Sequence, residues 1–122
     1  MPGYDYASNK RTLILVLRYG CRYCDESLPL YKRLLELRRE GQIRGVNMLA
    51  IFPDNPTVAK SVLDEEGLDI SFIPSVNLAQ LRIPGTPTLL LMDDKGSILE
   101  VWVGKLSEGK ELDLIDHLRR PT

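Results

Sequence analysis

The chain has 122 residues, of which 43% are hydrophobic and 27% charged, and its formal net charge is −1 at pH 7. This length fits one compact domain, so we expect a single domain over residues 1–122, with an irregular lead-in over residues 1–11. The near-neutral charge gives no electrostatic reason to expect nucleic acid or an acidic membrane as a partner. There is no apolar run of about 18 residues for a membrane span, and we expect no signal peptide or anchor in this chain.

The first predicted elements are a strand and a helix. The continuous apolar run over residues 12–17 is typical of a strand buried on both faces. The helix that follows extends to Gly41, which is placed to cap its C-terminus, and Pro29 predicts a kink inside this helix rather than its end. The inward stripe of the helix, spaced by four, three and four residues, is predicted to be Cys24, Leu28, Tyr31 and Leu35.

A second strand and helix follow in the same order. The strand is predicted over residues 46–52, and the helix starts at Asn55-Pro56, a good N-terminal cap and first turn, and ends at Gly67. Strand, helix and strand in succession imply a parallel pair joined by a right-handed crossover. Residues 68–81 are less regular, and we expect a short extended piece and one helical turn there.

The last third of the chain predicts a hairpin and a helix. Strands over residues 88–92 and 98–103 flank a turn signal at residues 93–96. A terminal helix over residues 108–119 has Ser107 as its cap, and its inward residues are predicted to be Leu112, Ile115 and Leu118. Four strands with helices on both faces predict a three-layer α/β/α sandwich, around a mixed sheet of four or slightly more strands.

The two cysteines of the chain, Cys21 and Cys24, allow three interpretations: a metal site, a structural staple or a redox pair. A structural zinc site needs about four ligands, but the chain has one histidine, His117, which we expect on the exposed side of the terminal helix. Haem attachment of the c type needs a histidine directly after the second cysteine, where Asp25 stands. We therefore expect no metal and no bound cofactor.

A staple between residues three apart stabilises little, because closing so short a loop is worth only about 2 kcal/mol. A redox pair uses the position better. Cys21 is predicted in the first helical turn, where free backbone N–H groups, the helix dipole and Arg22 favour a thiolate, while Cys24 points inward. Lowering a thiol pKa from about 8.5 to about 7 speeds attack only a few-fold, because nucleophilicity falls with the pKa. Positioning of the target sulfur must supply the rest, and this requires a docking surface.

A candidate for that surface is the Thr86-Pro87 step directly before the strand at residues 88–92. Proline at the start of a sheet strand is accommodated either as a plain loop residue or through a cis peptide bond. Residue type alone leaves both alternatives open.

The combination of these motifs resembles the thioredoxin superfamily, and within it the TlpA/ResA-like thiol–disulfide oxidoreductases. The matching segments are TLILVLRYGCRYCDESLP, VNMLAIFPDNP, LRIPGTPTLLLMDDKGSILEVWVG and the terminal helix, together about residues 10–119. The resemblance implies that Cys21 attacks a target disulfide and that Cys24 resolves the mixed disulfide. It also implies a cis Pro87 beside both cysteines, with the backbone around Thr86 pairing with the substrate.

Partners and location are further expectations from the resemblance. We expect Arg22, Tyr23, Thr86 and Pro87 to contact substrate, and the redox-active disulfide to serve in place of a cofactor. Partners would be protein thiols and disulfides and, as electron donor, a membrane thiol-transfer protein, with cytochrome c maturation or disulfide repair as the task. The resemblance favours an extracytoplasmic or periplasmic location, and we expect a monomer.

The chain departs from the family pattern at several positions. Tyr19-Gly20 replaces the usual tryptophan before the first cysteine, and Tyr23 replaces a common proline. Ser27 stands where many relatives carry a proton-relay glutamate, while Glu26 should point elsewhere. Leu15 replaces the buried aspartate of general thioredoxins. No obvious carboxylate is therefore placed to deprotonate Cys24, and proton transfer would use water.

The sequence leaves two other function classes open, a thiol peroxidase and a non-catalytic binding module. A thiol peroxidase of related fold needs threonine or serine three residues before its reactive cysteine, where this chain has Arg18. The Arg22-Tyr23 pair and the missing tryptophan leave room for a binding module, although a module that only docks would have no use for both cysteines. A copper chaperone would need a different cysteine spacing and a better-placed histidine than His117.

Overall fold

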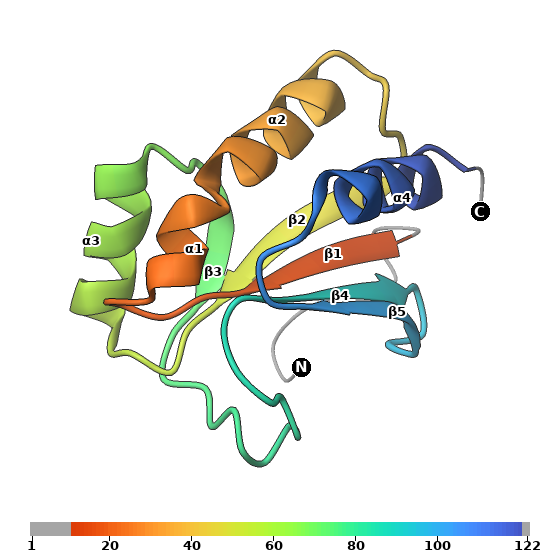
Figure 1. Ribbon diagram of the computed structural model, residues 1–122. Coiled ribbons are helices and arrows are strands. Elements are labelled where there is room, and N and C mark those ends of the chain that lie inside the picture. The colour runs from red at the N-terminus through yellow and green to blue at the C-terminus, as the bar shows by residue number, and fades with distance from the viewer. Residues whose placement is uncertain (1–10, 121–122) are drawn as a thin grey trace.

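The computed structural model describes residues 11–120, which form five strands and four helices (Figure 1). Their order is β1 (Arg11–Val16), α1 (Arg22–Glu26), α2 (Leu28–Arg39), β2 (Val46–Ile51), α3 (Pro56–Glu66), β3 (Ser71–Ile73), β4 (Thr88–Asp93), β5 (Ile98–Val103) and α4 (Glu108–Arg119). The predicted lead-in overlaps β1 at Arg11, and its other residues, 1–10, lie outside the described residues. Among the described residues, no helix is both long and apolar enough to span a membrane.

The strands form one mixed sheet in the order β3-β2-β1-β4-β5. β1 pairs in parallel with β2, and β2 with β3, whereas β4 is antiparallel to both β1 and β5. The predicted extended piece within residues 68–81 is confirmed as β3, which raises the strand number to five. The predicted helical turn in this stretch corresponds to a hydrogen-bonded turn over residues 78–82, which is too short to form a helix.

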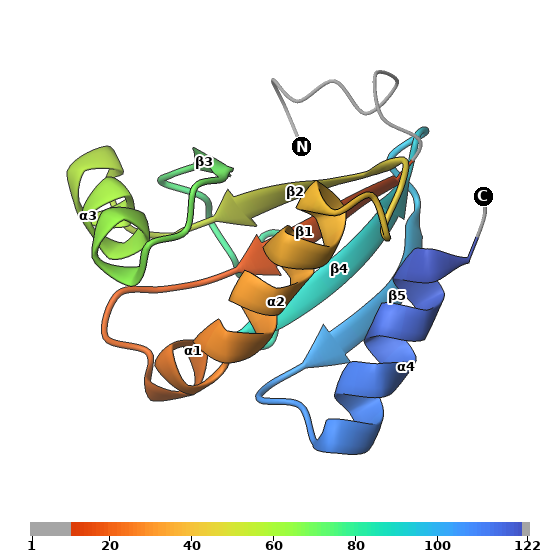
Figure 2. The same ribbon diagram turned by 90° about the horizontal axis from the view of Figure 1, so that it is seen from above.

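All four helices pack on the same face of the sheet. Their buried side chains, including Cys24, Leu34, Ala59 and Leu114, belong to one core cluster, and Figure 2 shows α1, α2 and α4 on one side of the strands. Both parallel crossovers are steps in the same direction across the sheet, from β1 to β2 and from β2 to β3. Right-handed crossovers of this kind place their helices on the same face.

The opposite face of the sheet carries a smaller core cluster. It is packed by side chains from the irregular segment that follows β3, among them Val76, Leu78 and Ile83. The expectation of helices on both faces is therefore wrong for residues 11–120. In the described part of the chain, an irregular segment occupies the place of the third layer.

The helix that follows the cysteine pair is divided at Ser27 instead of being one kinked helix. Pro29 lies in the first turn of α2. Ser27 is the C-cap residue of α1 and also the N-cap residue of α2. Proline lacks an N–H and its ring excludes the carbonyl four residues earlier, so the regular bonding pattern is interrupted here. At this division the N–H of Ser27 is shared between the carbonyl of Tyr23, four residues earlier, and that of Cys24, three residues earlier, at 3.1 and 3.2 Å.

The inward faces of two helices differ from the prediction. In α2 the buried residues are Leu30, Tyr31, Leu34 and Leu37. The predicted Leu28 and Leu35 are only partly buried at the edge of this cluster. In α4, whose bounds and Ser107 cap are confirmed, Leu114 is buried beside Ile115 and Leu118. The predicted Leu112 is 68% exposed.

The predicted helix ends are confirmed. Asn55 caps α3 by accepting from the N–H of Val58 at 2.9 Å. Gly67 ends the same helix with φ +68°, and Gly41 follows the end of α2 with φ +77°. Both glycines adopt the left-handed conformation that a C-terminal cap requires.

Candidate redox site

The chain delivers Cys21 to the edge of the sheet at which β1 ends. After β1, the N–H of Leu17 still bonds to the carbonyl of Ile51 at 3.0 Å, and Gly20 then turns the chain with φ +72°. Cys21 is the N-cap of α1, with extended backbone, and its Sγ accepts a hydrogen bond from the N–H of Cys24 at 3.2 Å. An N-cap side chain lies among free backbone N–H groups, which favour a negative charge on the sulfur after reduction.

The two cysteines form a disulfide, with their Cα atoms 5.2 Å apart. Cys21 is 5% exposed and Cys24 7% exposed, and both belong to the main core cluster. A target sulfur can therefore reach this bond only if the target makes close contact with the surface around it. The pairing agrees with the redox interpretation of the sequence.

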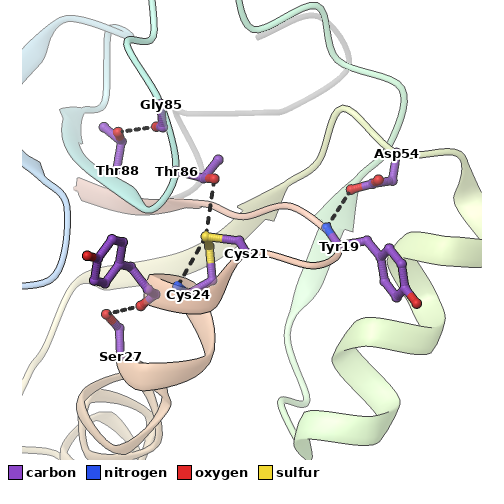
Figure 3. The surroundings of a disulfide bond; sticks show 9 residues. Tyr19, Cys21, Cys24, Ser27, Asp54, Gly85, Thr86 and Thr88 are labelled. Carbon is purple, nitrogen blue, oxygen red and sulfur yellow. Dashed lines mark hydrogen bonds between the residues drawn. A yellow bond between two sulfur atoms is a disulfide. The ribbon is translucent and has the colours of Figure 1, made fainter.

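Thr86 approaches the same sulfur from the other side of the site (Figure 3). Its hydroxyl donates to Cys21 Sγ at 3.3 Å across 65 residues of sequence, and the Thr86–Pro87 peptide bond is cis. The register explains this approach, since Val16 pairs with Thr88 in the antiparallel β1–β4 ladder. The end of β1 and the start of β4 therefore lie at the same edge of the sheet.

The segment before β4 is fixed by its own hydrogen bonds. The hydroxyl of Thr88 donates to the carbonyl of Gly85 at 2.7 Å, as Figure 3 shows. Pro87 and Thr88 are buried, whereas Thr86 is half-buried and Gly85 exposed. Of the predicted substrate-contacting residues in this segment, Thr86 is thus the one that presents a partly open side chain beside the disulfide.

The outer rim of the site is aromatic and basic. Tyr19 is 65% exposed and Tyr23 53% exposed, and the guanidinium of Arg22 lies 6.0 Å from the centre of the Tyr23 ring. The N–H of Tyr19 donates to Asp54 Oδ2 at 3.0 Å, which holds the segment before Cys21 against the start of α3. Arg22 and Tyr23, both predicted to contact substrate, lie next to the disulfide and reach solvent.

A cluster of charges lies on the exposed side of α1. Glu26 accepts from Arg22 Nε and from Lys105 Nζ, each at 2.9 Å. The hydrogen bond from Lys105 is the largest cause that holds the pKa of Glu26 below its usual value, followed by that from Arg22. Sequence reasoning missed Lys105, because nothing in the local pattern at residue 105 signals a contact with a residue 79 positions earlier.

No carboxylate lies beneath the disulfide among the described residues. Leu15, at the position of the family's aspartate, is fully buried in the main cluster. Ser27 is buried as well, and its hydroxyl donates to the carbonyl of Tyr23 at 2.7 Å. The buried polar side chains of residues 11–120 are Arg11, Thr12, Ser27 and Thr88. Within the described part of the chain, no buried carboxylate is therefore placed to take the proton from Cys24.

His117 is not the exposed residue that the sequence predicted. Its side chain is 26% exposed, and its ring lies edge-on to that of Trp102, with the centres 5.8 Å apart. This contact places His117 between α4 and β5, away from the cysteines. Within residues 11–120, no group of three or more histidine, cysteine, aspartate or glutamate side chains is arranged to hold a metal ion.

The chain matches no known family profile and no curated protein sequence. Its structure is similar to a thiol-disulfide isomerase from Corynebacterium glutamicum, with a TM-score of 0.76 and 20% identity over 97% of this chain and 86% of that chain. It is also similar to the thioredoxin domain of a thiol-disulfide oxidoreductase from Bacteroides vulgatus, with a TM-score of 0.70, 15% identity and coverage of 95% and 83%.

A third similar structure is a secreted disulfide oxidoreductase from Mycobacterium tuberculosis, with a TM-score of 0.67, 13% identity and coverage of 89% and 82%. At these identities the likeness concerns the fold. The mixed five-stranded sheet, the helices on it and the cysteine pair at the start of α1 agree with that likeness. The chain has the thioredoxin fold.

Proposed function

We propose that the protein is a thiol–disulfide oxidoreductase that exchanges disulfides with protein substrates. The observation that carries this proposal is the Cys21–Cys24 disulfide at the N-terminus of α1, with the Thr86 hydroxyl directed at Cys21 Sγ. A disulfide that serves only as a staple gains little from closing so short a loop. A helix N-terminus and a hydroxyl donor at one sulfur instead favour the thiolate that attacks a disulfide.

The reaction is a two-electron exchange. The Cys21 thiolate attacks one sulfur of the target disulfide, forms a mixed disulfide and releases the second target sulfur as a thiolate, which takes a proton from solvent. Cys24 then loses its proton to water and attacks Cys21 Sγ, which breaks the mixed disulfide. The target leaves with both of its sulfurs reduced, and Cys21–Cys24 is left as the disulfide. The reverse sequence oxidises a substrate dithiol.

Substrate contact falls to the residues around this sulfur. Arg22 and Tyr23 supply exposed side chains between the cysteines, and Thr86 and Pro87 supply the segment along which an extended target chain would lie. The exposed side chains of Tyr19, Arg22 and Tyr23 around the disulfide offer contacts to a protein or peptide target that a small thiol would leave unused. The same proposal extends to the protein's setting. Its electron donor would be a membrane thiol-transfer protein, its task cytochrome c maturation and its location extracytoplasmic.

Reduction of insulin disulfides by the dithiol form tests the proposal. We expect turnover by the parent protein, loss of turnover in Cys21→Ser, and accumulation of a mixed disulfide through Cys21 in Cys24→Ser. Cys21→Ser that retains the parent activity would exclude the assigned attack. Peroxide consumption without insulin reduction would identify a thiol peroxidase instead, and the absence of both activities would favour a binding module.

A further inference from the structure

Two adjacent residues that follow β5, Gly104 and Lys105, form hydrogen bonds with the two segments of the redox site. One segment is α1, which follows Cys21, and the other is the Thr86-Pro87 segment before β4. The N–H of Gly104 donates to the carbonyl of Pro87 at 2.8 Å, on the segment that carries Thr86. The ammonium of Lys105 donates to Glu26 at 2.9 Å, at the C-terminal end of α1. The Gly104-Lys105 step therefore contacts the cysteine helix and the Pro87 segment at the same time.

These bonds close a ring of contacts around the disulfide. Thr86 Oγ1 donates to Cys21 Sγ at 3.3 Å, and Arg22, the residue after Cys21, donates to Glu26 at 2.9 Å. The members of this contact ring, in order, are Cys21, Thr86, Pro87, Gly104, Lys105, Glu26 and Arg22. Each neighbouring pair in it is joined by a covalent bond or by one of these hydrogen bonds.

We propose that Lys105 and Glu26 are positioning residues of the redox site. Their ion pair holds α1 toward the Pro87 segment, and so keeps the Thr86 hydroxyl on the sulfur of Cys21. This inference rests on the proposed function, in which the thiolate of Cys21 attacks the target disulfide. The side chains of Lys105 and Glu26 are 48% and 32% exposed, so the pair is accessible to salt and its hold is modest.

The two residues allow a sharp distinction between positioning and simple charge. A purely electrostatic effect on the Cys21 thiolate has opposite signs for the two neutral variants. Lys105→Gln removes a positive charge and would raise the pKa of the thiol, whereas Glu26→Gln removes a negative charge and would lower it. Loss of positioning instead weakens the Thr86 contact in both variants, and so raises the thiol pKa in both.

The experiment measures the pKa of the Cys21 thiol by thiolate absorbance in Lys105→Gln, Glu26→Gln and the double variant. We expect each single variant to reduce the acid dissociation constant of the thiol roughly two- to fivefold, the range of an exposed ion pair. The double variant should equal the larger single effect, because either substitution already opens the ring. High salt should bring the parent protein close to the variants.

Two matched controls lie outside the contact ring. Lys95→Gln removes an exposed lysine from the β4–β5 turn, and Glu36→Gln removes the carboxylate that pairs with Arg39 on α2. Neither substitution should change the thiol pKa. A lower pKa in Glu26→Gln together with a higher pKa in Lys105→Gln would overturn the inference, and so would an unchanged pKa in both.

A second measurement needs neither a substrate nor a free thiol. In the oxidised protein, exchange of the Gly104 N–H with solvent should be faster in Lys105→Gln, because the bond to Pro87 opens more often. Unchanged exchange would contradict the positioning role. Both readouts are independent of turnover. An inactive protein that passes these tests would refute the proposed function alone, and an active protein that fails them would refute this inference alone.

Discussion

The hydroxyl of Thr86 lies 3.3 Å from Sγ of Cys21, although the two residues are 65 positions apart in the chain. Cys21 Sγ also accepts the N–H of Cys24 from within α1. The sulfur is thus approached by one donor from the helix and one from the segment before β4. After reduction, both donors favour the thiolate form, because a hydrogen bond to the charged form lowers the pKa of a thiol.

Thr86→Val should raise the pKa of the Cys21 thiol. Valine keeps the β-branched shape of threonine and removes the hydroxyl that bonds to the sulfur. Loss of a hydrogen bond to a charged acceptor is worth about 1.5 kcal/mol, which corresponds to about one pKa unit. Thiolate absorbance against pH in the reduced protein measures the shift. Thr57→Val, at an exposed position in α3, is the control, and an unchanged pKa in Thr86→Val would contradict the assigned role of this hydroxyl.

Arg11→Met should destabilise the fold at the end of the sheet where β1 begins. The Arg11 guanidinium is buried and donates to the carbonyls of His117, Leu118 and Arg120, at 2.9, 3.1 and 2.6 Å, at the end of α4. Desolvation lowers the pKa of this group from its usual value. Methionine fills much of the space but leaves the carbonyls unpaired, so we expect a loss of about 2–3 kcal/mol in the free energy of unfolding.

Urea unfolding measures this loss. Arg44→Met is the matched control, because Arg44 is exposed and donates to a single carbonyl, that of Gly41, at 3.1 Å. Its substitution should stay within about 0.5 kcal/mol of the parent. Equal unfolding midpoints for the two variants would show that the hydrogen bonds from Arg11 to the end of α4 do not stabilise the fold.

The local features of this fold could be read from the sequence because they depend on neighbouring residues. An asparagine before a proline, a glycine after a helix and an uninterrupted apolar run each determine structure within a few residues. The cysteine pair at a helix start belongs to the same class. Thr86 and Cys21 are in contact but 65 positions apart in the sequence. For this reason, only the resemblance to a known family indicated that Pro87 lies beside the cysteines.

The features that sequence reasoning missed depend on how elements meet. The side of the sheet that each helix covers follows from strand order, which no single segment contains. The contact of Lys105 with Glu26 requires β5 to return beside α1. In α4, leucine occurs at positions 112, 114 and 118, so two overlapping apolar stripes fit the helical repeat equally well. Which of the two stripes is buried, that of Leu112 or that of Leu114, then depends on how α4 packs against the sheet.

Replacing Leu114 by alanine should lower the free energy of unfolding much more than replacing Leu112. Leu114→Ala removes a side chain that is fully buried in the main cluster and should cost about 2–5 kcal/mol. Leu112→Ala removes one that is 68% exposed and should change stability by less than about 0.5 kcal/mol. The helix propensity term is the same for both substitutions, so the comparison isolates burial. A larger loss in Leu112→Ala, by thermal or urea unfolding, would show that α4 packs by the other stripe.

Tyr31→Phe should protect the fold at high pH. Tyr31 is 1% exposed, and desolvation raises the pKa of its phenol from 10.0 to about 12, although a hydrogen bond with Ser27 opposes this. The unfolded chain therefore releases the phenol proton near pH 10, whereas the folded chain keeps it to about pH 12. The stability that Tyr31 contributes is present below pH 10 and is lost as the pH rises to about 12.

The full loss from this titration is about 2–3 kcal/mol. The measurement is the free energy of unfolding in urea for the parent, Tyr31→Phe and Tyr23→Phe, near neutral pH and near pH 11. Between the two pH values the parent and Tyr23→Phe should lose the same amount, because Tyr23 is 53% exposed. Tyr31→Phe should lose less, since phenylalanine has no proton to release from the core. An equal loss in all three proteins would mean that the Tyr31 phenol is not held in its neutral form by burial, and would place that ring in contact with water.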